Sequence, residues 1–356
     1  MLSEFALARA GWRRSAAVAE ARPPLLECFG IRSLDQLRRD YLEVARHALR
    51  RDRYTFGLSS YSLLRPELSV PTYLGFMRSD GLAPIYNLFD RHGGARHYSQ
   101  RVTRRWQRDF RGGRLSYDEH NGTDLVCPIG TPLCAAAPGI VVLHRDRFLR
   151  GGMTVAVDHG HGVITQYTHC ARAVAAVGQR VARGDTVALS GAAGIDLVNF
   201  VPLVPPHIHF MVWVDGVPSD PFLAAGEAPR PGIWLDGNDP RPSGPLAEDP
   251  AATPFSPVDR EALWRVADGC RDDQINAEID RCKSDLTQLA ALIEDASFHD
   301  EFAFAAELRL QNLRGPLTDD RLAAAMQIRL TLPLPSAHYC GAYCADFRGS
   351  APANGG

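Results

Sequence analysis

Short runs of apolar and β-branched residues fill the middle of the chain. They are bounded by Gly, Pro, Asp or Asn, and they occupy residues 139–143, 153–157, 163–167, 186–189 and 208–214. Strands this closely spaced leave no room for the crossover helices that a parallel sheet requires. The pattern therefore predicts an antiparallel all-β core between about residue 120 and residue 222.

Helical periodicity is found on both sides of this β region. The clearest amphipathic pattern covers residues 34–49, and Ser33 with Gln36 forms a capping box in front of it. Apolar residues return to helical spacing later in the chain, with Asp or Thr near several starts, over residues 259–266, 273–294, 300–313 and 319–330. The expected fold class is therefore α+β and multidomain, with a central antiparallel all-β domain between N-terminal and C-terminal helical regions.

Composition divides the chain into six segments. They are a mainly helical N-terminal region (1–90), an Arg-rich connector (91–114), the β domain (115–225), a Pro-rich linker (226–257), a helical C-terminal region (258–335) and a Cys- and Gly-containing tail (336–356). The connector reads most simply as a solvated surface, and contact with an anionic polymer is the functional alternative.

The overall balance of residues excludes several protein classes. The chain has 356 residues, 45% of them hydrophobic, and a formal net charge of −2. This composition is typical of globular proteins and gives no global reason to expect nucleic-acid binding. No apolar run approaches the roughly 18–20 residues that cross a bilayer, and the N-terminus lacks a signal-peptide pattern. The eight scattered cysteines favour buried thiols over a disulfide framework.

Two short motifs carry the candidate chemistry. His120 and Asp124 are four residues apart, and in an extended segment they point to the same face. His207 and His209 do the same at a spacing of two. Two neutral imidazoles and one carboxylate are a suitable set for a catalytic zinc site, which keeps one position for water. A third pair, His159 and His161, lies in a Gly-flanked stretch and is interpreted as a hairpin turn.

The residues around and between these motifs resemble the lysostaphin/LytM-type zinc endopeptidases. The resemblance is limited to about residues 115–222 and covers neither helical flank. It is carried by the motifs at 120–124, 130–142, 157–162, 167–169, 177–185, 190–191 and 206–210.

The resemblance implies a fold, a reaction and a set of site residues. The fold is a small antiparallel β-sheet groove, and the reaction is hydrolysis of peptide bonds in peptidoglycan stems or cross-links. One Zn²⁺ per chain has His120, Asp124 and His209 as ligands. His169 and His207 are the catalytic residues, acting as general base or transition-state stabiliser. An apolar insertion, 195–205, departs from the family pattern and is expected near the groove wall, so substrate preference is not transferred.

Two other functions fit the same residues. One is a zinc peptidase that cleaves a protein substrate, which the lack of a signal peptide favours. The other is a non-catalytic peptide-binding regulator of another cell-wall hydrolase, with the helical flanks as a possible surface for a protein partner. The sequence reads as cytoplasmic, whereas the substrate class lies in the cell envelope or outside the cell. The N-terminal helices are also candidates for a cover over the groove.

Overall fold

A computed structural model gives the fold of the protein. It describes residues 4–16, 22–49, 63–91, 109–113, 115–116, 120–148, 151–198, 200–227, 233–250, 255–300, 303–309 and 311–345. Most of the Arg-rich connector and the end of the tail lie outside the described residues, so the predictions for those parts remain predictions.

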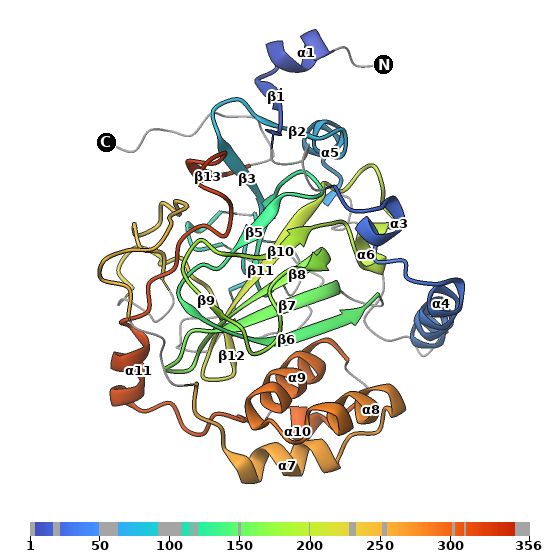
Figure 1. The fold of residues 1–356 in the computed structure, drawn as a ribbon, viewed down its shortest axis with the longest axis vertical. Helices are drawn as coiled ribbons and strands as arrows, with labels where there is room; N and C mark the ends of the chain where they lie inside the picture. The colour runs from blue at the N-terminus through green and yellow to red at the C-terminus, as the bar shows by residue number, and fades with distance from the viewer. Residues whose placement is uncertain are drawn as a thin grey trace.

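The N-terminal region contains strands as well as helices (Figure 1). Its elements are α1 (Glu4–Arg9), β1 (Trp12–Arg14), α3 (Leu25–Cys28), α4 (Leu34–Leu49), α5 (Pro66–Tyr73), β2 (Phe76–Arg78) and β3 (Leu82–Asn87). The helix expected over 34–49 is confirmed. The expectation of a mainly helical region is wrong for β3, which is buried almost throughout and so lacks the alternating pattern that marks a half-exposed strand.

The central region forms one large sheet. Its elements are β4 (Thr123–Val126), β5 (Pro132–Cys134), β6 (Gly139–Arg147), β7 (Gly152–Asp158), β8 (Val163–Ala173), β9 (Arg180–Val181), β10 (Thr186–Ser190), α6 (Ile195–Val198), β11 (His207–Val214) and β12 (Val217–Ser219). The main strand order is β13-β3-β4-β11-β8-β7-β6-β9. The pairs within 123–219 are antiparallel as predicted, but β13 (Gly341–Cys344) pairs parallel with β3. The sheet is therefore mixed, and both flanks contribute a strand to it.

The C-terminal helices differ in part from the predicted pattern. They are α7 (Arg260–Asp268), α8 (Asp273–Cys282), α9 (Leu286–His299), α10 (Ala306–Arg309) and α11 (Asp319–Ala325). The single helix expected over 273–294 is two helices, because the Asp285 carboxylate accepts from the first backbone amides of α9 and starts a new helix there. The helix expected over 300–313 is wrong except for the short α10.

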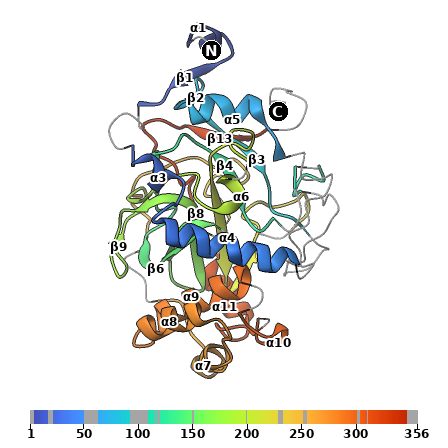
Figure 2. The ribbon, with the colours of Figure 1, turned by 90° about the vertical axis from the view of Figure 1, so that its right-hand side faces the viewer.

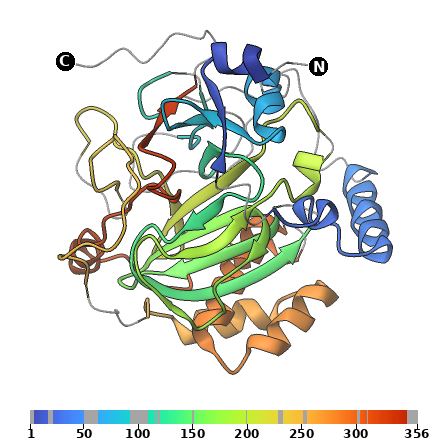
Figure 3. The same cartoon turned by 45° about the horizontal axis from the view of Figure 1, so that its top comes forward.

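Helices α7, α8 and α9 cover part of one face of the sheet; they are the orange helices beneath the strands in Figure 3. Met211 and Trp213 of β11 are buried under them, and the Trp213 ring lies 5.8 Å from that of Phe298 in α9. Side chains alternate along a strand, so this face also carries His207 and His209. The helices thus pack beside the candidate site, on the same face of the sheet.

A buried ion-pair cluster fastens α8 and α9 to β6. The Arg145 side chain is only 4% exposed, and its guanidinium lies 2.9 Å from Glu278, 2.7 Å from Asp295 and 2.8 Å from Asp300. Asp295 also accepts a hydrogen bond from Gln166 of β8. The helical layer is therefore bound to the sheet by charge as well as by apolar contact.

The segment predicted to be a linker is packed against the sheet region where it is described. Trp234 is 1% exposed and forms a β-bridge with Leu330. Asp249 is ion-paired with the buried Arg183. Apolar and charged anchors of this kind override the Pro-rich composition, so these residues do not separate two independent units.

The prediction of buried thiols holds for Cys28, Cys127, Cys134 and Cys170, whereas Cys270, Cys282 and Cys344 are half-buried and Cys340 is exposed. No helix among the described residues has the length and apolarity needed to cross a membrane. Helix α4 lies to the right of the sheet in Figure 1 and therefore in front of it in Figure 2, and α7 to α9 lie below the sheet in both views. The sheet therefore has helices from both flanks around it.

Candidate metal centre

Two neighbouring antiparallel strands bring Asp124 and His209 together. The register of β4 and β11 places Asp124 directly opposite His209, and His207 lies two residues before His209 on the same face of β11. All three residues are buried. The spacing of two between the histidines therefore places them side by side, as the sequence predicts.

His120 reaches the same place by a different route from the one predicted. Strand β4 begins only at Thr123, so His120 and Asp124 are not joined by a continuous extended segment. The chain turns at Asn121 and Gly122 instead. A Cβ atom at Gly122 would lie 2.6 Å from the Phe210 carbonyl oxygen and 3.0 Å from the His209 ring, so this turn requires glycine.

His169 joins the cluster through an irregularity in β8. Alternation would place it on the opposite face from Thr168, which pairs with His209. His169 instead has a positive φ of 66°, and the register with β7 shifts between Met153 and Val155. An extra residue in β8 re-aims the side chain, as bulges beside active sites often do. The His169 ring then lies 4.9 Å from the His207 ring and 6.1 Å from the His209 ring.

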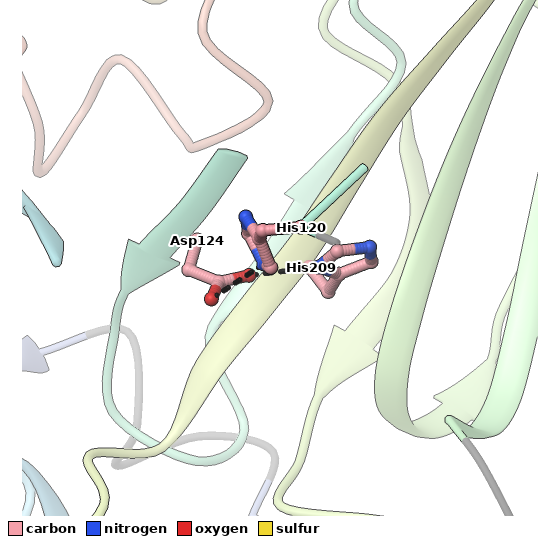
Figure 4. A group of neighbouring side chains, drawn as sticks. All are labelled: His120, Asp124 and His209. Carbon is pink, nitrogen blue, oxygen red and sulfur yellow. Dashed lines mark hydrogen bonds and ion pairs between the residues drawn. The ribbon is translucent and has the colours of Figure 1, made fainter. Parts of the chain in front are cut away.

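One atom from each of His120, Asp124 and His209 converges on a common point. These atoms lie within 4.8 Å of one another (Figure 4). His120 Nε2 is 2.9 Å from Asp124 Oδ2, and His209 Nδ1 is 2.8 Å from Asp124 Oδ1. Two imidazoles and a carboxylate in this arrangement can hold a divalent metal ion.

The outer nitrogens of both histidines in this set are held by oxygen atoms. His120 Nδ1 is 3.0 Å from the Leu88 carbonyl oxygen, and His209 Nε2 is 2.8 Å from Asn121 Oδ1. Metal-binding histidines usually donate their second ring N–H to such an oxygen, which fixes the tautomer and the ring orientation. Each inner nitrogen is then left with a lone pair directed at Asp124.

The two remaining histidines follow the same rule. His207 Nδ1 is 2.8 Å from the Pro205 carbonyl oxygen, and His169 Nδ1 is 2.8 Å from the Ala193 carbonyl oxygen. With these nitrogens donating, both Nε2 atoms are acceptors. His207 Nε2 lies 3.6 Å from Asp124 Oδ1, so it borders the metal-binding set without belonging to it.

Burial and neighbouring charges set the protonation of the cluster. Burial lowers the pKa of His209 to about 4 and also lowers that of His207, with Asp124 opposing both shifts. Burial, with the charges of His207 and His209, places the pKa of His169 well below its usual range. Burial raises the pKa of Asp124, but His120 and His207 outweigh it and hold that pKa well below its usual range. His120 differs, because burial lowers its pKa but the charge and hydrogen bond of Asp124 outweigh burial and raise that pKa above its usual value. At neutral pH the cluster therefore contains a carboxylate and the neutral imidazoles of His169, His207 and His209, and a metal ion would compete with a proton on His120.

His209 provides a test of whether a metal ion fits. Its two ring nitrogens each lie 2.8 Å from an oxygen, one from Asp124 and one from Asn121. A neutral imidazole has a single N–H and can satisfy only one of them. A cation shared by Nδ1 and the carboxylate removes this conflict, so the donor set fits a metal.

Comparison with known proteins agrees with this geometry. Residues 118–221 match the sequence model of Peptidase family M23. This segment resembles M23 peptidases, and the match covers less than a third of the chain.

Curated proteins with similar sequences include a peptidoglycan endopeptidase and a related carboxypeptidase/endopeptidase. Peptidoglycan DD-endopeptidase ShyA of Vibrio cholerae is 36% identical over 105 residues, which is 30% of this chain and 23% of the relative. DD-carboxypeptidase/endopeptidase Mpg of Neisseria meningitidis is 30% identical over 111 residues, which is 31% of this chain and 24% of the relative. The match thus spans about a quarter of the length of each relative.

A solved structure of a zinc containing peptidase from Vibrio cholerae is 28% identical and covers 39% of each chain. Its TM-score is 0.27.

The sequence alone did not single out Asn121 or the backbone oxygens that orient the four rings. Asn121 stands next to a candidate ligand, but only the turn at Gly122 brings its amide to His209. Tyr86 was also missed; it belongs to β3, and its ring lies 4.8 Å from the His207 ring in an edge-on contact.

The apolar insertion, residues 195–205, packs against the N-terminal region. Leu197 and Val204 of the insertion lie in one apolar cluster with Trp12, Leu68 and Tyr86. The backbone amide of Arg65 donates to the Leu203 carbonyl oxygen in the same region. Through Tyr86, this cluster reaches His207.

Proposed function

We propose that the protein is a zinc-dependent endopeptidase that hydrolyses peptide bonds in peptidoglycan. The observation that carries the proposal is the convergence of His120, His207 and His209 on Asp124, with His169 packed against the last two rings. Each of the four rings has one nitrogen 2.8–3.0 Å from a fixed oxygen. A purely structural cluster has no need for four such imidazoles around one carboxylate. The match to family M23 supports the same reaction.

The substrate class rests on the relatives. ShyA is named a peptidoglycan DD-endopeptidase and Mpg a DD-carboxypeptidase/endopeptidase. The match to family M23, residues 118–221, covers the residues of the cluster. We therefore assign this protein peptide bonds in peptidoglycan stems or cross-links and place its action in the cell envelope.

His120, Asp124 and His209 would hold the zinc ion, one per chain. When bound, zinc supplies Lewis acidity to the attacking water and to the scissile carbonyl. Asp124 contributes the negative charge of the site. Leu88 and Asn121 hold the ligand rings in the tautomers that face the metal.

His169 and His207 are the candidate residues for proton transfer. Each neutral ring offers an Nε2 lone pair, so either one can accept the proton of the attacking water. The imidazole that has accepted this proton becomes a donor and can pass it to the leaving amine or hydrogen-bond the oxyanion. The carbonyl oxygens of Pro205 and Ala193 keep both rings oriented for this exchange.

The reaction is tested by mass spectrometry of fragments released from purified peptidoglycan, with and without a zinc chelator. We expect release of peptide fragments that stops with the chelator and resumes when zinc is added back. The masses identify the cleaved bond. Intact peptidoglycan in every arm, or release that continues in the chelator, would contradict the proposal.

Asn121 provides a separate test of the metal site. The Asn121→Leu substitution removes the oxygen that orients His209, and we expect zinc to bind about 10- to 100-fold more weakly. Asn121→Asp is the matched control, because it retains an acceptor oxygen at nearly the same place. Competition with a chromophoric chelator measures both affinities. Equal affinities in the two variants would show that His209 needs no acceptor.

A further inference from the structure

We infer that the N-terminal segment 28–30 contributes to the active site, because it fixes the position of the loop that orients His169. This inference rests on the proposed role of His169 as a catalytic residue. The loop is residues 191–194, and its contact with His169 is the Ala193 carbonyl oxygen, 2.8 Å from His169 Nδ1. Residues 28–30 lie far outside the M23 match at 118–221.

The orientation of His169 depends strongly on this loop. Its backbone has the left-handed φ of 66°, which a non-glycine residue adopts only when its surroundings hold it there. Its amide donates to the Gly151 carbonyl oxygen at 2.8 Å. Within the described part of the chain, the hydrogen bond that holds the ring is the one to the Ala193 carbonyl oxygen. A shift of that carbonyl therefore moves the ring.

The N-terminal segment is bonded directly to the loop. The Ala192 amide donates to the Cys28 carbonyl oxygen at 2.7 Å, and Cys28 is buried. Close approach is possible because position 191 is glycine. A Cβ there would lie 2.8 Å from the Cys28 oxygen and 2.8 Å from the His169 oxygen. One residue of the loop thus lies between the N-terminal segment and β8.

The Ala193 methyl group is packed between two further glycines. A Cβ at Gly30 would lie 2.9 Å from the Ala193 Cβ, and one at Gly152 would lie 2.3 Å from it. Both distances are shorter than real Cβ contacts, so a side chain at either position displaces Ala193. The lack of a side chain at Gly30 therefore leaves space for Ala193. It also allows the left-handed backbone conformation of Gly30, with φ of 70°.

These contacts make Gly30 and Ala193 positioning residues for His169. They also give the N-terminal region a role opposite to that of a cover. A cover would lower the rate when in place, whereas a segment that positions His169 is required for the rate.

The test compares two alanine substitutions with the same backbone strain. Gly30→Ala adds a methyl group against Ala193. Gly237→Ala adds one at a φ of 67° with no atom within 4 Å. A misplacement of about 1 Å in a catalytic group can cost roughly 100-fold in rate. We therefore expect Gly30→Ala to lower kcat by about 10- to 100-fold with KM and bound zinc unchanged, and Gly237→Ala to keep the wild-type kcat.

Rescue identifies the contact. Ala193→Gly removes the methyl group at position 193. The double variant Gly30→Ala/Ala193→Gly has a methyl group at position 30 instead, so the two side chains no longer clash. We expect the double variant to be more active than Gly30→Ala alone. Equal loss in Gly30→Ala and Gly237→Ala, or no rescue in the double variant, would overturn the inference.

A spectroscopic readout separates this inference from the proposed function. In ¹⁵N NMR of the histidine rings, with His169→Gln for assignment, the His169 Nδ1–H signal should shift and exchange faster in Gly30→Ala and in Ala193→Gly. Ala193→Gly adds no atoms, so it keeps the test open if Gly30→Ala does not fold. An unchanged His169 signal in Ala193→Gly would refute the inference, whereas an inactive wild-type protein with the shifted signal would refute only the proposed function.

Discussion

Replacing His209 with alanine is expected to remove stoichiometric zinc and to lower peptidoglycan cleavage by at least about 1000-fold. His209 is a buried member of the only set of His, Cys, Asp and Glu side chains in the described ranges whose atoms converge as a metal site. A catalytic metal contributes several kcal/mol to transition-state stabilisation, and each 1.4 kcal/mol is a factor of ten. Elemental analysis of the purified variant and the fragment assay measure the two effects.

Two further variants make the result specific. His338→Ala removes an imidazole from a segment whose backbone contacts Arg13 near β1, and it should retain both zinc and activity. His169→Ala should retain zinc but lose about 100- to 10,000-fold in rate, the usual contribution of general acid–base catalysis. If His209→Ala kept its zinc, the ligand set would be wrong. If His169→Ala lost zinc, His169 would have to be counted among the ligands.

Replacing Arg145 with methionine is expected to destabilise the protein by about 3–5 kcal/mol at pH 7. The substitution removes the cation that buried Asp295 and Asp300 share, and it leaves only His299 beside Asp295 and Arg147 beside Asp300 among the described ion pairs. Breaking a buried ion pair by removing one partner costs about that much. Denaturant unfolding, with circular dichroism as the signal, measures the loss. Arg265→Met is the matched control. It breaks an exposed i, i+4 pair with Glu261, and such pairs contribute less than about 1 kcal/mol.

The effect of Arg145→Met should also depend on pH. Burial raises the pKa of Asp295, but His299 and Arg145 outweigh it and hold that pKa well below its usual range. A carboxylate of this kind stabilises the fold above its unfolded pKa of about 3.9 and loses that contribution as pH falls through its folded pKa. The difference in the free energy of unfolding between wild type and Arg145→Met should therefore become smaller below about pH 4. If this difference stayed constant from pH 7 to pH 3, the carboxylates would be excluded as the cause of the destabilisation.

The sequence predicted that these residues lie close together better than it predicted the backbone that brings them together. His207 and His209 follow from strand alternation, and the register of β4 with β11 brings Asp124 opposite His209. His169 does not follow from alternation, because it reaches the cluster through a bulge and a left-handed backbone. Asn121 has no sequence signal as a partner of His209. The local sequence pattern shows which residues share a face of a regular strand. Where the backbone is irregular, tertiary contacts determine which way a side chain points.

The flanks were harder to predict for the same reason. Asp259, Asp272 and Asp285 each cap a helix, and capping residues act locally, so α7 to α9 lie near the predicted region. Strands β3 and β13 are stabilised by partners far away in sequence. The Pro-rich composition of 226–257 suggested a linker, but the burial of Trp234 depends on a surface that only the folded chain provides.

The pairing of β3 with β13 has a consequence for synthesis on the ribosome. Leu82 of β3 lies opposite Gly341 of β13, so the two strands are about 260 residues apart in the sequence. At roughly 5–20 residues per second, the nascent chain holds β3 with one edge unpaired for many seconds. An open edge of this kind is a site for wrong pairing between chains. The edge of β3 therefore stays open to such pairing until β13 has been translated.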